Sequence, residues 1–224
     1  MSQILLVRHG QASWGAADYD VLSDVGEQQA RVVGAALSAR GVVPDLVLHG
    51  AMKRQRETAR LLVEAAGWTD WSGAAEEDIA WDEMDHHAVL ERQPKTFEGA
   101  QPSAREFQVW FERATERWTS GDFDDEYAES FPAFTDRVRT ALDVLAGRLD
   151  ASGTAIVVTS GGPIARLVAD LLGGDVRTHS LLAPVIVNAS VTKIVVGRRG
   201  TSLVSFNDHS HLEATRDDDL LTYR

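Results

Sequence analysis

Short, continuous apolar runs that alternate with helical patterns restrict the fold of this chain more than any other feature. The clearest runs are residues 4–7, 45–48 and 154–159, and the last reads Thr-Ala-Ile-Val-Val-Thr. Runs this short, with no polar alternate face, are typical of strands that are buried on both sides of a sheet. Because such a sheet needs helices on both faces, the alternation predicts a mainly parallel sheet with a helical cover.

Helix and turn signals complete the expected architecture. Helical spacing predicts helices over 24–40, 51–66, 132–150 and 163–172. A short strand is expected over 78–81, and an antiparallel hairpin over 190–196 and 202–206 at the sheet edge. The chain, 1–224, is therefore expected to form one domain. This domain is a three-layer α/β/α sandwich with a mainly parallel sheet, an antiparallel edge hairpin and a partly helical insertion.

The insertion is the polar, acidic stretch 86–130, which carries interleaved aromatic residues. We expect it to lie over the end of the sheet at which a ligand would bind. Its aromatic side chains either form a small core of their own or stack on a ligand. Its acidity disfavours highly anionic polyphosphates as substrates. The acidic residues Asp217–Asp219 are expected at a solvated end of the chain.

Charge and composition exclude several classes of protein. The formal net charge is −12, and the 224 residues include no cysteine. Disulfide scaffolds, cysteine nucleophiles and cysteine-ligated zinc sites are therefore excluded. The charge argues against nucleic-acid or anionic-membrane partners, because phosphate contacts need Lys and Arg surfaces. No apolar run reaches the ~18 residues of a membrane span, and Met1–Gln3 do not begin a signal peptide, so a cytoplasmic location is expected.

Three features follow expected strands, at the ends where open α/β sheets bind ligands. Arg8–Gly10 follow the first strand, Lys53–Arg56 the second and Ser160–Pro163 the central one. The topology therefore brings all three towards one rim of the sheet. Taken singly, each has a simpler explanation: a polar strand end, a set of solvated cations and a tight turn.

The basic residues Lys53, Arg54 and Arg56 occupy the expected first turn of a helix. Cations there oppose the helix macrodipole, which favours anions at that end. A bound phosphate would remove the conflict, because it accepts hydrogen bonds from arginines and from free helix amides. The nucleotide-binding motifs G-x-x-x-x-G-K-[ST] and G-x-G-x-x-G do not occur in the sequence, so nucleotide cradles of those types are not expected.

Three motifs resemble, in order and spacing, those of the histidine phosphatase superfamily, also called phosphoglycerate mutase-like. Residues 8–10 resemble its Arg-His-Gly signature, residues 22–30 its Leu-[Ser/Thr]-x-x-Gly-x-x-Gln-Ala block, and residues 54–59 its Arg-x-x-x-Thr-Ala block. Jointly these motifs are specific, and the resemblance covers essentially the whole chain.

The resemblance implies a role for each matching residue. His9 would be the nucleophile and carry a phosphohistidine, and Arg8 and Arg54 would bind the phosphate. Glu83 falls where the family usually has its general acid, and would protonate the leaving alkoxide. The candidate accessory phosphate contacts are Gln11, Ser23, Ser160 and Gly161.

Elementary chemistry agrees with these residue types. A neutral imidazole nitrogen is a competent nucleophile and divides hydrolysis into two easier steps. Phosphoryl transfer is catalysed mainly by positioning and charge stabilisation, and two arginines match a phosphate dianion. An alkoxide leaving group needs a proton, which a carboxylic acid beside a dianion retains readily. Asp82 and Asp85 are the alternatives to Glu83 for this task.

The family normally carries a second histidine after its central strand, and here that position is Ser160. Serine donates one hydrogen bond, but it is shorter than histidine and never cationic. Neutral hydrogen bonds contribute ~0.5–1.5 kcal/mol, whereas charged ones contribute ~1.5–3 kcal/mol. Loss of one preorganised donor typically costs ~10²–10³ in rate. We therefore expect a weakened or specialised phosphatase.

Other histidines could compensate for the missing one. His86 and His87 follow the candidate acid and could point into the pocket, and His49 precedes the basic helix. His209 and His211 share a face if the chain is extended there, which would make them a metal pair. Carboxylate and cysteine partners in register are missing, so no metal site and no cofactor are expected.

The leading hypothesis is a metal-independent phosphomonoesterase that acts through His9 on a phosphorylated small molecule. A mutase of the same fold is a second hypothesis, but the acidic stretch 86–130 has no extra basic cluster to hold a substrate carboxylate. A non-catalytic protein that binds a phospholigand or a partner is the third, because of Ser160. The edge hairpin could expose a strand for homodimer formation.

Overall fold

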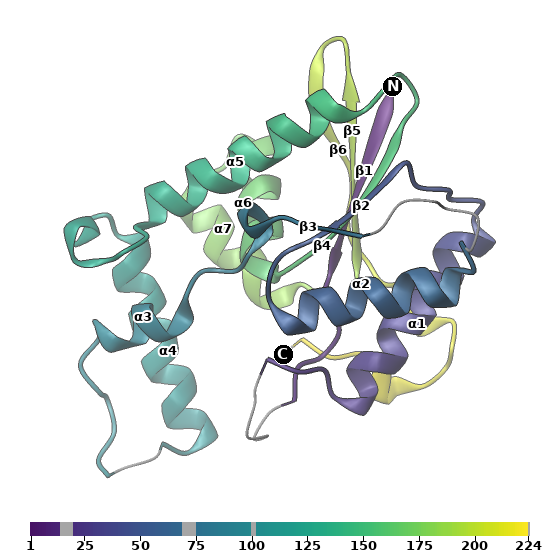
Figure 1. Cartoon of the computed structure of the whole chain (residues 1–224). Coiled ribbons are helices and arrows are strands. Elements are labelled where there is room, and N and C mark those ends of the chain that lie inside the picture. Colours follow the sequence, from purple (N-terminus) through teal and green to yellow (C-terminus); the bar gives the residue numbers. More distant parts are fainter. Residues whose placement is uncertain (14–19, 69–74, 100–101, 224) are drawn as a thin grey trace.

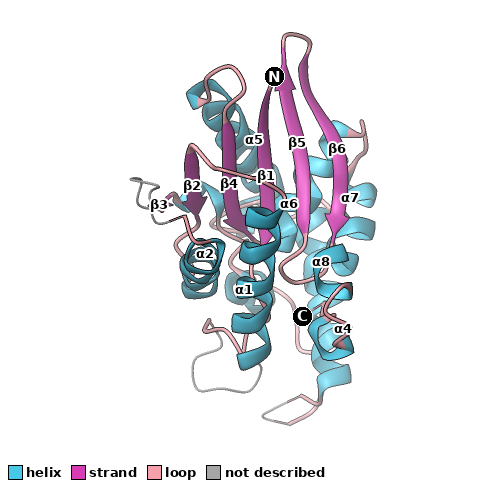
Figure 2. Ribbon diagram, turned by 90° about the vertical axis from the view of Figure 1, so that its right-hand side faces the viewer, coloured by secondary structure: helices cyan, strands magenta, loops and turns pink. Residues whose placement is uncertain are grey.

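The computed structural model describes residues 1–13, 20–68, 75–99 and 102–223. Within these ranges, six strands form one sheet (Figure 1). Their order is β3-β2-β4-β1-β5-β6 (Figure 2). The strands are β1 (Ser2–Arg8), β2 (Leu46–His49), β3 (Glu76–Glu77), β4 (Thr154–Thr159), β5 (Val191–Gly197) and β6 (Gly200–Asp208).

The sheet is parallel on one side of β1 and antiparallel on the other. β1 pairs in parallel with β4, β4 with β2, and β2 with β3, whereas β1–β5 and β5–β6 are antiparallel. Every residue of β4 is buried, as expected for a central strand with helices on both faces. The predicted parallel sheet with an antiparallel edge hairpin is confirmed.

Helices cover both faces of the sheet (Figure 2). On one face, α1 (Asp24–Ala39) and α2 (Lys53–Ala66) bury Val33 and Leu62 against Val47 and Ile156 of the strands. On the other face lie α5 (Phe131–Arg148) and α6 (Gly161–Leu171), whose apolar side chains join a second core cluster. The three-layer α/β/α sandwich is thus confirmed. No helix in the described ranges is long and apolar enough to span a membrane.

The stretch 86–130 contains the helices α3 (His86–Glu91) and α4 (Ala104–Thr119) and the short 3₁₀ helix η2 (Asp124–Glu126). Trp118, at the end of α4, is fully buried, with its ring edge-on to Phe131 and Phe134 at 5.1 and 5.4 Å between centroids. Trp110 packs edge-on to Phe97 at 5.5 Å. These aromatic side chains pack on one another and on the core beside α5, so packing accounts for them without a ligand.

The expected strand over 78–81 is wrong. The side chain of Asp78 accepts a hydrogen bond from the backbone N–H of Ala80 at 3.0 Å, which turns the chain into the 3₁₀ helix η1 (Ile79–Trp81). The actual edge strand, β3, lies just before this turn and is only two residues long. The sequence also did not predict the short helices α7 (Val176–Leu182), η3 (Ala183–Val185), α8 (Ser210–Glu213) and η4 (Asp218–Leu220).

Candidate functional site

His9 lies at the centre of the site, just beyond the carboxyl end of β1, and only 6% of it is exposed. Its Nδ1 lies 2.7 Å from the carbonyl oxygen of Gly10, and its Nε2 lies 3.1 Å from Nε of Arg54. A carbonyl only accepts and a guanidinium only donates, so the two partners select one neutral tautomer. The proton is on Nδ1 and the lone pair is on Nε2.

The electrostatic surroundings of His9 maintain this neutral form. Burial lowers the pKa of His9 well below its ordinary value, and the positive charges of Arg54 and Arg8 lower it further. The hydrogen bond to the Gly10 carbonyl acts in the opposite direction and is outweighed. The imidazole therefore keeps its lone pair at neutral pH, as a nucleophile requires.

Two glycines allow the loop after His9 to pass close to α1. A Cβ on Gly10 would lie 2.3 Å from the carbonyl oxygen of Gly26, and one on Gly26 would lie 2.1 Å from that of Gln11. No other residue type fits either position without moving the backbone. The N–H of Gly10 donates to Oγ1 of Thr58 in α2 at 3.0 Å. The three sequence blocks that carry the resemblance thus fold directly against one another.

Arg54 is the one cation of the basic helix start that turns into the site. It is 6% exposed, whereas Lys53 and Arg56 are exposed. Its Nη1 lies 2.6 Å from Oδ1 of Asp20, and the other oxygen of Asp20 accepts from the backbone N–H of Lys53 at 2.8 Å. This carboxylate lies at the helix N-terminus, where the sequence indicated an anion. Asp20 precedes the second motif and could not be predicted from it.

Arg8 is held from the carboxyl-terminal part of the chain. Its Nη1 donates to the carbonyl oxygens of Ile186 and Tyr223, the latter at 2.7 Å. Its guanidinium carbon would lie 3.9 Å from a Cβ on Gly161, so Arg8 and the start of α6 are neighbours. The expected solvated end is exposed at 217–219, but the residues that follow return to the site.

Ser160 is 1% exposed and directly precedes α6. Its Oγ accepts a hydrogen bond from Nε2 of Gln55 at 2.9 Å. Gln55 is completely buried and lies beside Arg54 in the first turn of α2. Gln55 was not predicted from the sequence, where its one local sign is a glutamine within an otherwise basic stretch.

The Glu83 carboxylate lies at the N-terminus of α6. Its Oε2 accepts from the backbone N–H of Gly162 at 2.9 Å, and its Oε1 accepts from the N–H of Met84 at 3.0 Å. A Cβ on Gly162 would lie 2.0 Å from Oε1, so the side chain rests directly on the glycine. Glu83 and Ser160 therefore flank the same helix start.

The two alternative acids have structural partners away from α6. Oδ1 of Asp82 accepts from the N–H of Ala51 at 2.7 Å, which fixes the loop before α2. Burial raises the pKa of Asp82, although the amide hydrogen bonds to its carboxylate act in the opposite direction. Asp85 caps α3 by accepting from the N–H groups of His87 and Ala88 at 3.0 and 3.1 Å. Of the three candidates, only Glu83 contacts the start of α6.

Ser23 and Gln11 form a support for the loop. The hydroxyl of Ser23 caps α1 by accepting from the N–H of Gly26 at 3.1 Å, and it donates to Oε1 of Gln11 at 2.8 Å. The N–H of Gln11 donates to Oε1 of the buried Gln29 at 2.8 Å. The structure thus places Ser23 behind Gln11, as a helix cap.

His86 lies near Arg54 and Asp20, and His87 is its exposed neighbour. Burial lowers the pKa of His86 to about 4, and the charges of Arg54 and Asp20 also act on it. His87 is exposed, with its ring centroid 4.1 Å from that of His86. His86 is therefore a neutral, half-buried group beside the arginine.

The other histidines take part in local packing. His49 is buried, and its Nδ1 donates to the carbonyl of Gly50 at 2.7 Å. His209 and His211 do not lie on an extended strand, because α8 begins between them, and Nε2 of His211 donates to the carbonyl of Ala189 at 3.0 Å. In the part of the chain that the structure describes, no three His, Cys, Asp or Glu side chains gather as a metal site would require.

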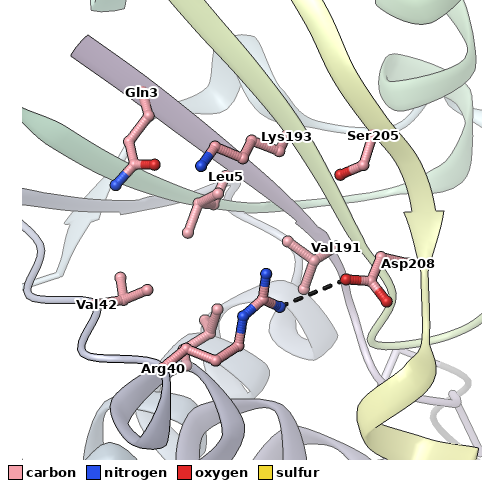
Figure 3. Close-up of a pocket in the computed structure, with 9 residues that line it drawn as sticks. Gln3, Leu5, Arg40, Val42, Val191, Lys193, Ser205 and Asp208 are labelled. Carbon is pink, nitrogen blue, oxygen red and sulfur yellow. Dashed lines mark hydrogen bonds and ion pairs between the residues drawn. The ribbon is translucent and has the colours of Figure 1, made fainter. Parts of the chain in front are cut away.

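A separate hollow lies between α1 and the strands β5 and β6 (Figure 3). Arg40 and Asp208 form an ion pair across it at 3.4 Å, and Lys193 points in from β5. Its volume of about 30 Å³ has room only for water. None of the candidate catalytic or phosphate-binding residues lines it.

Fold and site together define an α/β protein in which a neutral histidine and two arginines meet at the carboxyl ends of parallel strands. A family model described as the histidine phosphatase superfamily (branch 1) matches residues 4–209. The chain therefore belongs to the histidine phosphatase superfamily, as the three motifs indicated.

Curated relatives with significant similarity are named 2,3-bisphosphoglycerate-dependent phosphoglycerate mutases. The relative from Thermobifida fusca is 31% identical over 118 residues, which cover 49% of this chain and 46% of that protein. The relative from Methylobacterium sp. is 36% identical over 83 residues, or 34% of this chain and 39% of that protein. The chain thus matches less than half the length of these relatives.

Solved structures resemble the chain over nearly its whole length. A variant of the phosphoserine phosphatase of Entamoeba histolytica, in complex with phosphoserine, has a TM-score of 0.68 at 20% identity, and covers 95% of this chain and 100% of that one. The mycobacterial glucosyl-3-phosphoglycerate phosphatase in complex with VO3 has a TM-score of 0.64 at 20% identity, with 92% and 99% covered. At this identity the likeness shows a common fold.

Proposed function

We propose that the chain hydrolyses phosphomonoesters through a phosphohistidine at His9, without a metal ion. The observation that carries the proposal is the fixed neutral tautomer of His9, with Nδ1 bonded to Gly10 and the Nε2 lone pair facing Arg54. Family membership supports the same chemistry. We expect Arg8, Arg54 and the start of α6 to contact a phosphate that meets Nε2.

Substrate binding has to exchange the partners of Arg54. In the free protein its Nε occupies the lone pair of His9 and its Nη1 binds Asp20. A phosphate dianion is the stronger acceptor, because charge-assisted bonds from arginine are often bidentate. Transfer of these donors to phosphate oxygens frees Nε2 for attack. Asp20 thus keeps the guanidinium in place until the phosphate arrives.

The first step transfers the phosphoryl group to the protein. Nε2 of His9 attacks phosphorus, the P–O bond to the alcohol breaks, and protonated Glu83 gives its proton to the departing oxygen. In the second step a water molecule attacks phosphorus and gives a proton to Glu83, the P–N bond breaks, and inorganic phosphate leaves. The sum is ester plus water to alcohol plus phosphate, and His9 and Glu83 are regenerated.

Ser160 and the backbone at Gly161 complete the proposed phosphate site. Ser160 would stand in for the second histidine of the family and contribute one neutral donor. Because this donor is weaker than an imidazolium, the proposed activity is that of a slow or narrowly specific phosphatase. Gln11, held by Ser23, is proposed as an accessory contact from the loop after His9.

A mutase is the second candidate, favoured by the names of the curated relatives. A mutase would retain the phosphoryl group on His9 until it passes to a hydroxyl group of a substrate that also carries a carboxylate, which distinguishes it from a hydrolase. The acidic stretch 86–130 lacks an extra basic cluster for such a carboxylate. Hydrolysis of a phosphorylated small molecule therefore remains our proposal.

The test is the release of inorganic phosphate from p-nitrophenyl phosphate in EDTA by the wild type and by His9→Ala. We expect turnover that His9→Ala abolishes, together with an acid-labile phosphoenzyme after rapid quenching of the wild type only. Equal background with both proteins would refute the proposal for this ester. Phosphate transfer between positions of a phosphoglycerate, dependent on a bisphosphate, would identify a mutase instead.

A further inference from the structure

We propose that Gln55 is a positioning residue that fixes the hydroxyl of Ser160 as a donor to the substrate phosphate. The inference rests on the proposed function, because it concerns the same site. Three observations carry it: the hydrogen bond that Ser160 accepts, the capping bond that it does not make, and the fixed orientation of the Gln55 amide.

The orientation of the Gln55 side chain follows from its partners. Its Oε1 accepts from the backbone N–H of Met52 at 3.4 Å, and its Nε2 lies 3.4 Å from the carbonyl oxygen of Trp81. The N–H can only donate and the carbonyl can only accept, so the amide cannot be reversed. Nε2 therefore faces Ser160, and the hydroxyl oxygen accepts its hydrogen bond at 2.9 Å.

The side chain of Ser160 does not cap α6, although Ser160 directly precedes this helix. A serine at this position normally accepts from an N–H of the first turn. Here no such bond forms, because Oε2 of Glu83 accepts from Gly162 instead. Glu83 therefore caps α6, and the hydroxyl of Ser160 can bind another partner.

The proton of Ser160 then has one direction left. Gln55 donates to the hydroxyl oxygen, and no described residue accepts the hydroxyl proton. Ser160 lies beside His9, because the backbone N–H of His9 donates to the carbonyl of Thr159 at 2.8 Å. Gly161 in turn adjoins Arg8. In the proposed mechanism, an oxygen of the phosphate bound by Arg8 and Arg54 would accept this proton. Gln55 makes a weak, freely rotating donor into a preorganised one.

Gln55→Glu tests this inference, because it keeps the shape and reverses the polarity. A carboxylate at this position still accepts from Met52, but it also accepts the proton of Ser160 and turns the hydroxyl away from the phosphate. We compare the effect of Gln55→Glu in the wild type with its effect in Ser160→Ala. The added negative charge weakens phosphate binding in both backgrounds, whereas the hydroxyl can be turned away only in the wild type. The readouts are the dissociation constant of inorganic phosphate, by calorimetry, and kcat/KM for p-nitrophenyl phosphate.

We expect Ser160→Ala to weaken phosphate binding by roughly 10- to 100-fold, the range for a hydrogen bond to a charged group. In the wild type, Gln55→Glu should weaken phosphate binding at least as much as Ser160→Ala does. In the Ser160→Ala background, the loss of affinity caused by Gln55→Glu should be about tenfold smaller. An equal cost in both backgrounds would overturn the inference. Gln55→Met, which is similar in size but has no amide, lets the hydroxyl rotate, and should cost only a few-fold in the wild type and nothing in Ser160→Ala.

The two readouts separate this inference from the proposed function. If the losses of phosphate affinity from the Gln55 and Ser160 substitutions are coupled but no turnover occurs, the proposed hydrolase activity is refuted and the role of Gln55 is supported. Turnover with independent losses would refute the role of Gln55 alone. If the wild-type protein does not bind phosphate, both the proposed function and the role of Gln55 are refuted. If thermal unfolding shows that Gln55→Glu is not folded, the pair Gln55→Met and Ser160→Ala gives the same comparison.

Discussion

Replacement of Gly162 by alanine tests whether Glu83 is the general acid, because the change displaces little besides its carboxylate. A Cβ on Gly162 would lie 2.0 Å from Oε1 and 3.1 Å from Oε2 of Glu83. These atoms end a flexible side chain, so they can move while the backbone stays. Loss of the capping hydrogen bond costs about 1 kcal/mol, and alanine in a helix regains about 0.5–1 kcal/mol. The free energy of unfolding should therefore change by less than about 1 kcal/mol.

The expected effect on activity depends on the leaving group. An alkoxide needs the proton of Glu83, so kcat/KM for an alkyl phosphate should fall by roughly 10²-fold or more. A p-nitrophenolate leaves without a proton, so kcat/KM for its ester should change only a few-fold. Glu83→Gln should reproduce this pattern. Gly147→Ala is the matched control, since its Cβ would meet nothing within 4 Å. Equal losses on both esters would refute the acid role of Glu83.

Further predictions follow from the charges and the packing of the site. Asp20→Asn should lower KM several-fold, because phosphate then no longer displaces a carboxylate from the arginine; an unchanged or raised KM would contradict this. Ser160→His should gain activity only together with Gln55→Ala, which vacates the space that the glutamine fills; a gain in the single variant would be the contrary result. Burial lowers the pKa of His9 and lowers that of His179 to about 4, so their unfolded forms bind protons below pH 6.5 while the folded forms do not. Stability should therefore fall in urea titrations as the pH falls from 6.5 towards 4, by up to about 1.4 kcal/mol per pH unit for each histidine, and constant stability between pH 7 and pH 5 would contradict it.

Most of the fold was predictable because the central strands are buried on both faces. A continuous apolar run such as that of β4 has few structures open to it, and helix ends are marked by local signals such as the glycine after α2. The exception, 78–81, is instructive. Ile79 is 68% exposed and Trp81 is buried, although residues two apart on a strand would share one face. The capping bond of Asp78 decides in favour of a turn, and it contributes nothing to the apolar pattern.

The site was predictable only where local sequence fixes it. The rule that ligands bind at the carboxyl ends of strands selects His9 and Ser160, and the motif selects Arg54 from among three cations. Gln55 was missed because its role depends on a hydrogen bond to a residue 105 positions away. Asp20 was missed for a similar reason, since it contacts Lys53 and Arg54 at the start of α2. Contacts between distant segments leave no pattern in either segment.

One set of positive charges serves two needs of the proposed mechanism. Arg8 and Arg54 repel a proton from His9 and attract the phosphate that His9 attacks. The same charges oppose the reaction once the imidazole has formed its P–N bond, because the ring then becomes positive. The Gly10 carbonyl offsets this cost, since it accepts from Nδ1 and raises the pKa of His9. A carboxylate at that position would bind the proton more strongly, but it would keep His9 protonated before the substrate arrives. A neutral carbonyl oxygen stabilises the developing charge and leaves the free histidine unprotonated.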